Sequence, residues 1–193
     1  LPFYHLFNLF LRGYEVHLAG NAELERHAAA DGLPCHKIET ITSNTFYERL
    51  KRGAFFYQEE ELEAYIRSER ELLARLRPDL VIGEFRLSLG VSCRLEGVRL
   101  LALANAYWSP AYACRFDPPA QGFLGALPEG LRKTLFNLLR PFAFRTWAAP
   151  LNRVRRRFGL PALNDFRQHY TDGDSCAYLD LPELIPLQDL PSG

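Results

Sequence analysis

The chain has 193 residues, 23 of them basic and 23 acidic, so its formal net charge is zero. This length suits one ordinary domain with an ample core, and the balanced charge gives no indication of a nucleic-acid partner. The four cysteines form no CxxC pair and the five histidines show no ligand spacing, so we expect no disulfide framework, metal or cofactor. Without a signal peptide or a membrane-spanning apolar run, the predicted location is the cytoplasm.

The first third of the chain alternates between helical and strand patterns. The predicted elements are an amphipathic helix at 1–11, a strand at 14–19, a helix at 22–30, a strand at 34–39 and an irregular segment at 40–56. Gly13 and Gly32 end the two helices. A helix that leads directly into a strand of a parallel sheet indicates an earlier strand. We therefore expect the first strand of the sheet to lie before residue 1.

A long amphipathic helix is predicted at 58–76. Its apolar residues are expected to point inward: Leu62, Tyr65, Ile66, Leu72, Leu73 and Leu76. Its charged residues are expected to form the exposed face: Glu59, Glu60, Glu61, Arg67, Glu69 and Arg70.

Residues 77–105 carry the most informative pattern, with an apolar strand at 79–83, a helix at 88–95 and a second apolar strand at 98–104. Two apolar strands joined by a helical crossover indicate a parallel pair buried on both faces. Open α/β sheets bind ligands at the carboxyl ends of their strands. The residues predicted at that edge are Glu84, Phe85, Arg86, Asn105, Tyr107 and Trp108.

The remaining residues continue the alternation of helix and strand. The predicted elements are a loop at 109–130, a helix at 131–157 with breaks or kinks at Pro141 and Pro150, a helical turn at 164–169 and a last strand at 175–179. Together these patterns predict an α/β fold with a doubly wound parallel sheet over residues 1–181. The Pro-rich residues 182–193 are interpreted as the start of an interdomain linker.

The segment 131–158 interleaves arginines and lysine with leucine, phenylalanine and tryptophan. A basic amphipathic helix can lie on an anionic membrane surface, which predicts peripheral membrane contact through 131–158. The alternative is that its apolar face packs on the sheet or on another domain while its arginines are solvated.

No GxGxxG, Walker, HExxH or GxSxG motif occurs in the chain. The sequence therefore encodes no glycine-rich loop for a nucleotide in this segment.

Three segments together resemble the N-terminal domain of GT-B glycosyltransferases, in particular the family 1 group of UDP-glucosyl and macrolide-type transferases. They are the RGYEV step at 12–16, the 77–105 unit with PDLVI followed by an acidic residue, and LNRVRRRFGLPAL at 151–163. Leu1 and Pro2 would follow the Gly-His loop of that group, and Tyr14 stands where its members usually have histidine. The resemblance covers almost the whole chain. It implies a Rossmann-like domain, the N-terminal half of a GT-B fold, with its first strand missing.

The resemblance also implies a division of labour between two domains. The N-terminal domain would hold a small-molecule or lipid hydroxyl acceptor, and a C-terminal domain outside this chain would bind the nucleotide sugar. Transfer would invert the sugar without a metal, and this chain alone would be inactive. A catalytic histidine would lie before Leu1, and Glu84 would take the position of the carboxylate that orients it. The implied acceptor-binding residues are Phe85, Arg86, Asn105, Tyr107 and Trp108.

Structural alternatives exist for the same residues. Glu84 could cap the helix that begins near Leu87 or pair with Arg86, and Tyr107 and Trp108 could be core or lid residues instead of an acceptor wall. At the level of function, the alternatives are a non-catalytic α/β module that binds a ligand or partner, and half of a GT-B-fold epimerase.

Overall fold

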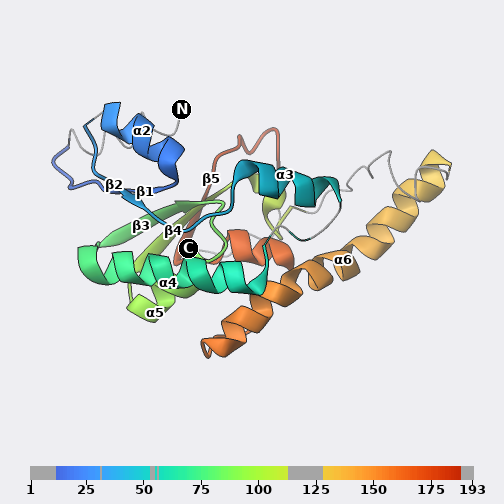
Figure 1. Cartoon of the computed structure of the whole chain (residues 1–193). Coiled ribbons are helices and arrows are strands. Elements are labelled where there is room, and N and C mark those ends of the chain that lie inside the picture. Colours follow the sequence, from blue (N-terminus) through green and yellow to red (C-terminus); the bar gives the residue numbers. More distant parts are fainter. Residues whose placement is uncertain (1–11, 31, 53–54, 56, 113–127, 188–193) are drawn as a thin grey trace.

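The computed structural model describes residues 12–30, 32–52, 55, 57–112 and 128–187 of the chain, shown in Figure 1. The helix predicted at 1–11 and much of the loop predicted at 109–130 lie outside these residues. The described elements are β1 (Leu18–Gly20), α2 (Ala22–Ala30), β2 (Cys35–Lys37), α3 (Ser43–Lys51), α4 (Glu59–Leu76), β3 (Leu80–Glu84), α5 (Leu89–Glu96), β4 (Arg99–Ala104), η1 (Ala106–Trp108), α6 (Glu129–Arg157), η3 (Phe166–Tyr170) and β5 (Ser175–Tyr178).

The described strands form two small parallel sheets, and the single doubly wound sheet over residues 1–181 stays a prediction. One sheet contains β1 and β2, and the other has the order β3-β4-β5. In the second sheet Glu84 lies opposite Leu103, and Ala104 lies opposite Tyr178. Parallel strands joined by helices confirm the α/β class and are consistent with a Rossmann-like fold.

The prediction that the β3–β4 pair is buried on both faces is wrong for β3. One face of the sheet is covered by α4 and α5, where Leu73 and Cys93 pack with Leu100 of β4. Leu80 and Ile82 lie on the other face, in register with Arg99 and Leu101, and are exposed. Among the described residues β3 also pairs only with β4, so it is an edge strand there.

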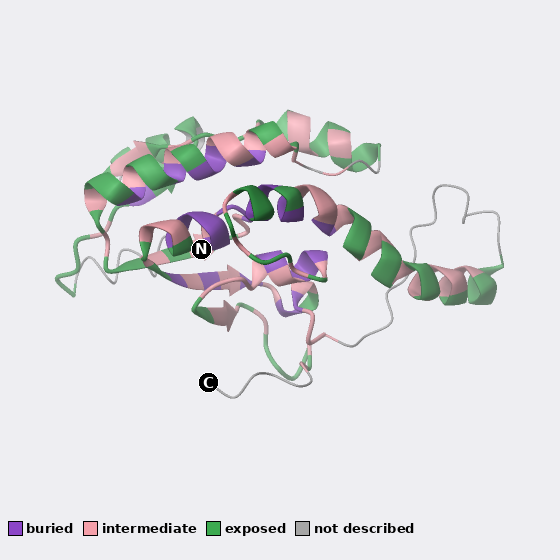
Figure 2. Cartoon of the chain, turned by 90° about the horizontal axis from the view of Figure 1, so that it is seen from below, coloured by how far each residue is buried: buried purple, intermediate pink, exposed green. Residues whose placement is uncertain are grey.

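The larger core lies where α4, α5, η3 and the end of α6 meet (Figure 2). Its buried residues are Leu62, Ile66, Leu87, Val91, Ala148, Leu151, Val154 and Phe166. A separate, smaller core of Leu18, Ala28 and Leu33 joins α2 to the first sheet. The turns that follow β3 and β4 contact this larger core through Leu87 and Trp108.

Local signals place the ends of α4 and α5 close to the predicted residues. A capping box links Gln58 and Glu61 at the start of α4, so two backbone N–H groups find side-chain acceptors. Gly97 ends α5 in the left-handed region with φ of 67°, a conformation that a residue without a Cβ adopts at little cost.

One sequence prediction about helices is wrong. Residues 40–56 were expected to be irregular, but α3 forms there, and the Thr42 hydroxyl caps it by accepting a hydrogen bond from the Thr45 N–H at 3.2 Å. Pro141 and Pro150, predicted as breaks or kinks, lie inside α6 and do not break it. Packing of Ala148 and Leu151 in the core holds the chain on both sides of Pro150.

Within the described ranges, no helix combines the length and apolar character needed to cross a membrane.

Candidate functional site

The carboxyl ends of β3 and β4 bring together the residues predicted to form the site. Glu84 is the last residue of β3, and Asn105 directly follows β4 and leads into η1. The Glu84 side chain is exposed, and within the described part of the chain it makes no hydrogen bond or ion pair. Its carboxylate is therefore available to a group that approaches this edge.

An aromatic wall of Phe85, Tyr107, Trp108 and Tyr170 stands beside Glu84. Ring centroids are 6.5 Å apart for Phe85 and Trp108, 5.1 Å for Phe85 and Tyr170, and 5.3 Å for Trp108 and Tyr170. Tyr107 forms the exposed end of the wall, and its hydroxyl accepts a hydrogen bond from Asn105 Nδ2 at 3.1 Å. Burial raises the pKa of Tyr170, so its hydroxyl stays protonated. Trp108 and Tyr170 also pack against the larger core, so Tyr107 is the ring of the wall that is exposed.

The turn between β3 and α5 is held in an uncommon backbone conformation. Phe85 has φ of 51°, in the left-handed region that a bulky residue rarely adopts. Such a conformation persists only where the surrounding structure enforces it. The neighbouring side chains show how this turn is held.

Glu69 of α4 lies beneath this turn and is only 2% exposed. Its carboxylate accepts hydrogen bonds from Arg86 Nε at 2.6 Å, from Ser88 Oγ at 2.5 Å and from Ser92 Oγ. The sequence prediction placed Glu69 on the exposed face of the helix, which is wrong. Three donors from the turn and from α5 satisfy the buried charge, so Glu69 fixes the turn that carries Glu84 and Phe85.

The guanidinium of Arg86 extends the same network toward the first sheet. Its Nη2 donates to the carbonyl of Glu39, just after β2, at 2.7 Å. The group also lies 4.2 Å from the centre of the Tyr65 ring, and the Tyr65 hydroxyl accepts a hydrogen bond from the Ile41 N–H at 2.5 Å. Arg86 therefore joins α4, the β3–α5 turn and the segment after β2.

These contacts bear on the alternatives for Glu84. Arg86 pairs with Glu69 instead of Glu84, and the N-cap position of α5 is Ser88. The acceptor-binding role assigned to Arg86 stays a prediction. Glu69, which sequence reasoning missed, had one signal in its favour. It follows Leu62 and Ile66 and precedes Leu73 at the helical spacing of buried residues.

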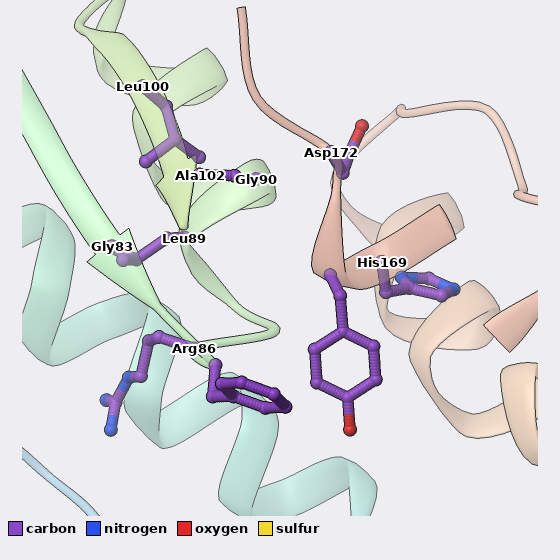
Figure 3. Close-up of a pocket in the computed structure, with 10 residues that line it drawn as sticks. Gly83, Arg86, Leu89, Gly90, Leu100, Ala102, His169 and Asp172 are labelled. Carbon is purple, nitrogen blue, oxygen red and sulfur yellow. The ribbon is translucent and has the colours of Figure 1, made fainter. Parts of the chain in front are cut away.

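The enclosed space near the site is too small for a substrate. Figure 3 shows a cavity of about 10 Å³ between the β3–α5 region, with Gly83 and Leu89, and the η3 region, with His169 and Asp172. That volume holds at most about one water molecule. A larger hollow of about 390 Å³ lies by Pro78, at the opposite end of β3. Glu84 is exposed, so the residues predicted for the site form an open edge and not an enclosed pocket.

Metal ligands do not gather among the described residues: no group of three or more His, Cys, Asp or Glu side chains there could hold an ion. Cys35, Cys93 and Cys176 are free thiols. Burial raises the pKa of Cys93 to about 12, so this thiol stays protonated and unreactive.

Comparison with known proteins points to sugar transfer. Over 93% of its length, the chain is 39% identical to the inactive PGL/p-HBAD biosynthesis glycosyltransferase of Mycobacterium bovis and to the PGL/p-HBAD biosynthesis glycosyltransferase of Mycobacterium tuberculosis. Its curated relatives are glycosyltransferases. A PGL/p-HBAD biosynthesis rhamnosyltransferase of M. bovis is 40% identical over 93% of the chain. No family model matches the chain.

The chain spans about half or less of these relatives: 49% of the inactive protein, 42% of the glycosyltransferase and 40% of the rhamnosyltransferase. The identity supports sugar transfer in general. A relative named inactive and one named without that word are equally similar to the chain. Similarity over this region therefore does not distinguish an active transferase from an inactive one.

Proposed function

We propose that this chain is the acceptor-binding part of a family 1-like GT-B glycosyltransferase. The whole enzyme transfers a sugar from a nucleoside diphosphate donor, such as a UDP-sugar, to the hydroxyl of a small molecule or lipid. A C-terminal domain beyond the linker at 182–193 binds the donor. The observation that carries the proposal is the placement of Glu84, an exposed carboxylate with no ion pair among the described residues, beside an aromatic wall at the carboxyl ends of two parallel strands.

The wall and the carboxylate have separate roles in acceptor binding. The acceptor body stacks on Tyr107 and Trp108, whose rings supply apolar area with few rotatable bonds. Asn105, which is half-buried at the same edge, offers polar contact. The reacting hydroxyl then lies toward Glu84. The turn held by Glu69 keeps this geometry in place before the acceptor arrives.

In the proposed reaction, a histidine that precedes Leu1 takes the proton from the acceptor hydroxyl. The acceptor oxygen attacks the anomeric carbon and the nucleoside diphosphate leaves, so the sugar is transferred with inversion. Glu84 accepts a hydrogen bond from the imidazole, which fixes its tautomer and stabilises the imidazolium that forms. The histidine and the donor domain both lie outside these 193 residues. The chain alone is therefore inactive.

The test is Glu84→Gln in the whole protein that contains this chain. The substitution keeps the size of the side chain but removes its charge, so we expect kcat to fall about 100-fold or more, with little change in the acceptor KM. Asp79→Asn is the matched control, because Asp79 is an exposed carboxylate next to the amino end of the same strand. It should leave kcat unchanged. Equal kcat values for Glu84→Gln and the unmodified enzyme would exclude the catalytic role.

A second candidate is a non-catalytic module that uses the same aromatic edge to bind a ligand. The similarity to a relative named inactive favours it. The two functions differ in one measurement: the whole protein either releases nucleoside diphosphate in proportion to glycosylated acceptor or binds ligand without turnover. Sugar transfer by the 193-residue chain alone would contradict both.

A further inference from the structure

Helix α6 has two parts with different surroundings. Residues 147–157, the inner segment, end in the core, whereas residues 129–146, the outer segment, extend beyond the rest of the described chain (Figures 1 and 2). One face of the outer segment reaches the core through Phe144. The opposite face of the outer segment carries large apolar side chains that are exposed and do not belong to the core of the described residues.

These apolar side chains form a stripe along one side of the helix. Leu131, Leu138 and Phe142 are seven and four residues apart, a spacing that places them on one face, and Leu139 lies next to it. Leu138 and Phe142 are each 73% exposed. Contiguous exposed apolar side chains of this kind mark surfaces that bind a partner or a membrane.

Positive charge gathers on the same segment. Residues 129–146 hold four basic side chains and one acidic side chain, although the whole chain has no net charge. The single acid, Glu129, pairs with Lys133 at 2.8 Å. Arg145 is exposed and has no ion pair among the described residues. An anionic surface would complement this charge.

We propose that the outer segment of α6 docks on an anionic phospholipid surface. The helix lies along the surface, with Leu138 and Phe142 in the apolar layer and its basic groups among the lipid phosphates. Eighteen helical residues cover roughly 27 Å, enough for one flat contact. Membrane contact was predicted through 131–158. We now limit it to the outer segment, because Ala148, Leu151 and Val154 of the inner segment already pack in the core.

A second copy of the chain fits this face less well. A two-fold contact would bring the same positively charged segment of each copy together, and like charges at an interface oppose association. A lipid surface offers apolar depth and negative charge at once. This proposal is independent of the proposed sugar transfer.

The test is co-sedimentation of the whole protein that contains this chain with vesicles of phosphatidylcholine alone or of phosphatidylcholine with phosphatidylglycerol. We expect binding to the anionic vesicles that weakens in 0.5 M NaCl and is about tenfold or more weaker for phosphatidylcholine alone. The double variant Leu138→Glu with Phe142→Glu should bind anionic vesicles at least about tenfold less tightly, because it places two negative charges in the contact.

The matched control also replaces two exposed apolar residues with glutamate, but elsewhere in the chain. Leu181→Glu with Leu184→Glu alters leucines that are 63% and 75% exposed, outside α6, and should bind like the unmodified protein. Circular dichroism should show both variants folded, since all four positions are exposed. Equal loss of binding in both variants would overturn the proposal. A second outcome would also overturn it. In that outcome the unmodified protein binds no vesicles but forms dimers in sedimentation velocity, and the α6 variant is monomeric.

Discussion

The two segments of α6 both mix basic and apolar residues, but their environments differ. In the inner segment Leu151 and Val154 are buried, and Arg155 reaches the carboxylate of Asp172. In the outer segment Leu138 and Phe142 are exposed. One continuous helix therefore carries a stretch that completes the core and a stretch that the described fold leaves open.

A basic amphipathic pattern therefore does not by itself determine whether a helix packs against its own fold or binds another surface. The apolar face of the inner segment packs against the fold, as the alternative predicted. Its arginines are not simply solvated, however, because acids from other elements pair with them. Arg153 and Arg157 pair with Glu59 of α4 at 2.5 and 2.7 Å. Such acids are spread over distant parts of the chain, so only the fold assigns them. Membrane contact stays a proposal for the outer segment.

The largest effect is expected from Asp172→Ala, which removes the acid between two arginines. Asp172 contacts Arg155, whose side chain is 3% exposed, and Arg94 at 2.7 Å. Without it Arg155 would remain as a buried, uncompensated charge. We expect the free energy of unfolding to fall by about 3–5 kcal/mol, as measured by urea denaturation.

The outer segment supplies the control for this change. Glu129→Ala removes an acid from an exposed pair with Lys133, and we expect a change within about 0.5 kcal/mol. Similar losses for the two variants would show that the two segments do not differ in how their charges are held.

A smaller effect is expected from pH, through His169 of η3. Burial, aided by the positive charge of Arg155, lowers the pKa of His169 to about 4, and Nε2 has no hydrogen-bond partner within the described part of the chain. In the unfolded chain the pKa is about 6.5. Between these values the unfolded chain binds more protons, so the free energy of unfolding falls as pH drops from 6.5 to 4, by at most about 3 kcal/mol.

The measurement is urea denaturation between pH 7 and 4 for the unmodified chain and for His169→Gln, which does not titrate. The carboxylates facing His169, Asp165 and Asp172, are present in both proteins. The difference between the two curves therefore reports the histidine. Parallel curves over this range would contradict the expected role of His169.

Local signals explain which parts of the fold could be predicted from the sequence. The capping box of Gln58 and the glycine after α5 act within a few residues, and the ends of α4 and α5 follow from them. Helix α3 was missed because the threonines of its cap are also typical of loops. The arrangement of the described strands in two sheets could not be predicted, because strand pairing depends on contacts between residues far apart in the chain.

The candidate site also contains residues that could be predicted from the sequence and residues that could not. Topology alone placed Glu84 and Trp108 at one edge, because parallel strands end on the same side. Glu69 was missed because a carboxylate on a helix is usually exposed, and because its donors Arg86, Ser88 and Ser92 lie 17 to 23 residues away. A buried charge can be predicted only when its partners are known.

The smallest effect is expected from Arg153→Ala in the inner segment. Its pair with Glu59 is half exposed, so we expect a loss below about 1 kcal/mol in urea denaturation, which disappears in 1 M NaCl. Arg145→Ala in the outer segment, which removes an exposed arginine without an ion pair, should change stability by as little. A loss for Arg153→Ala as large as that for Asp172→Ala would contradict this. If the free energy of unfolding changes little for both Arg153→Ala and Arg145→Ala, the exposed ion pair of the inner segment neutralises its charge without stabilising the fold much. The positive charge on the outer segment then contributes little to the free energy of unfolding.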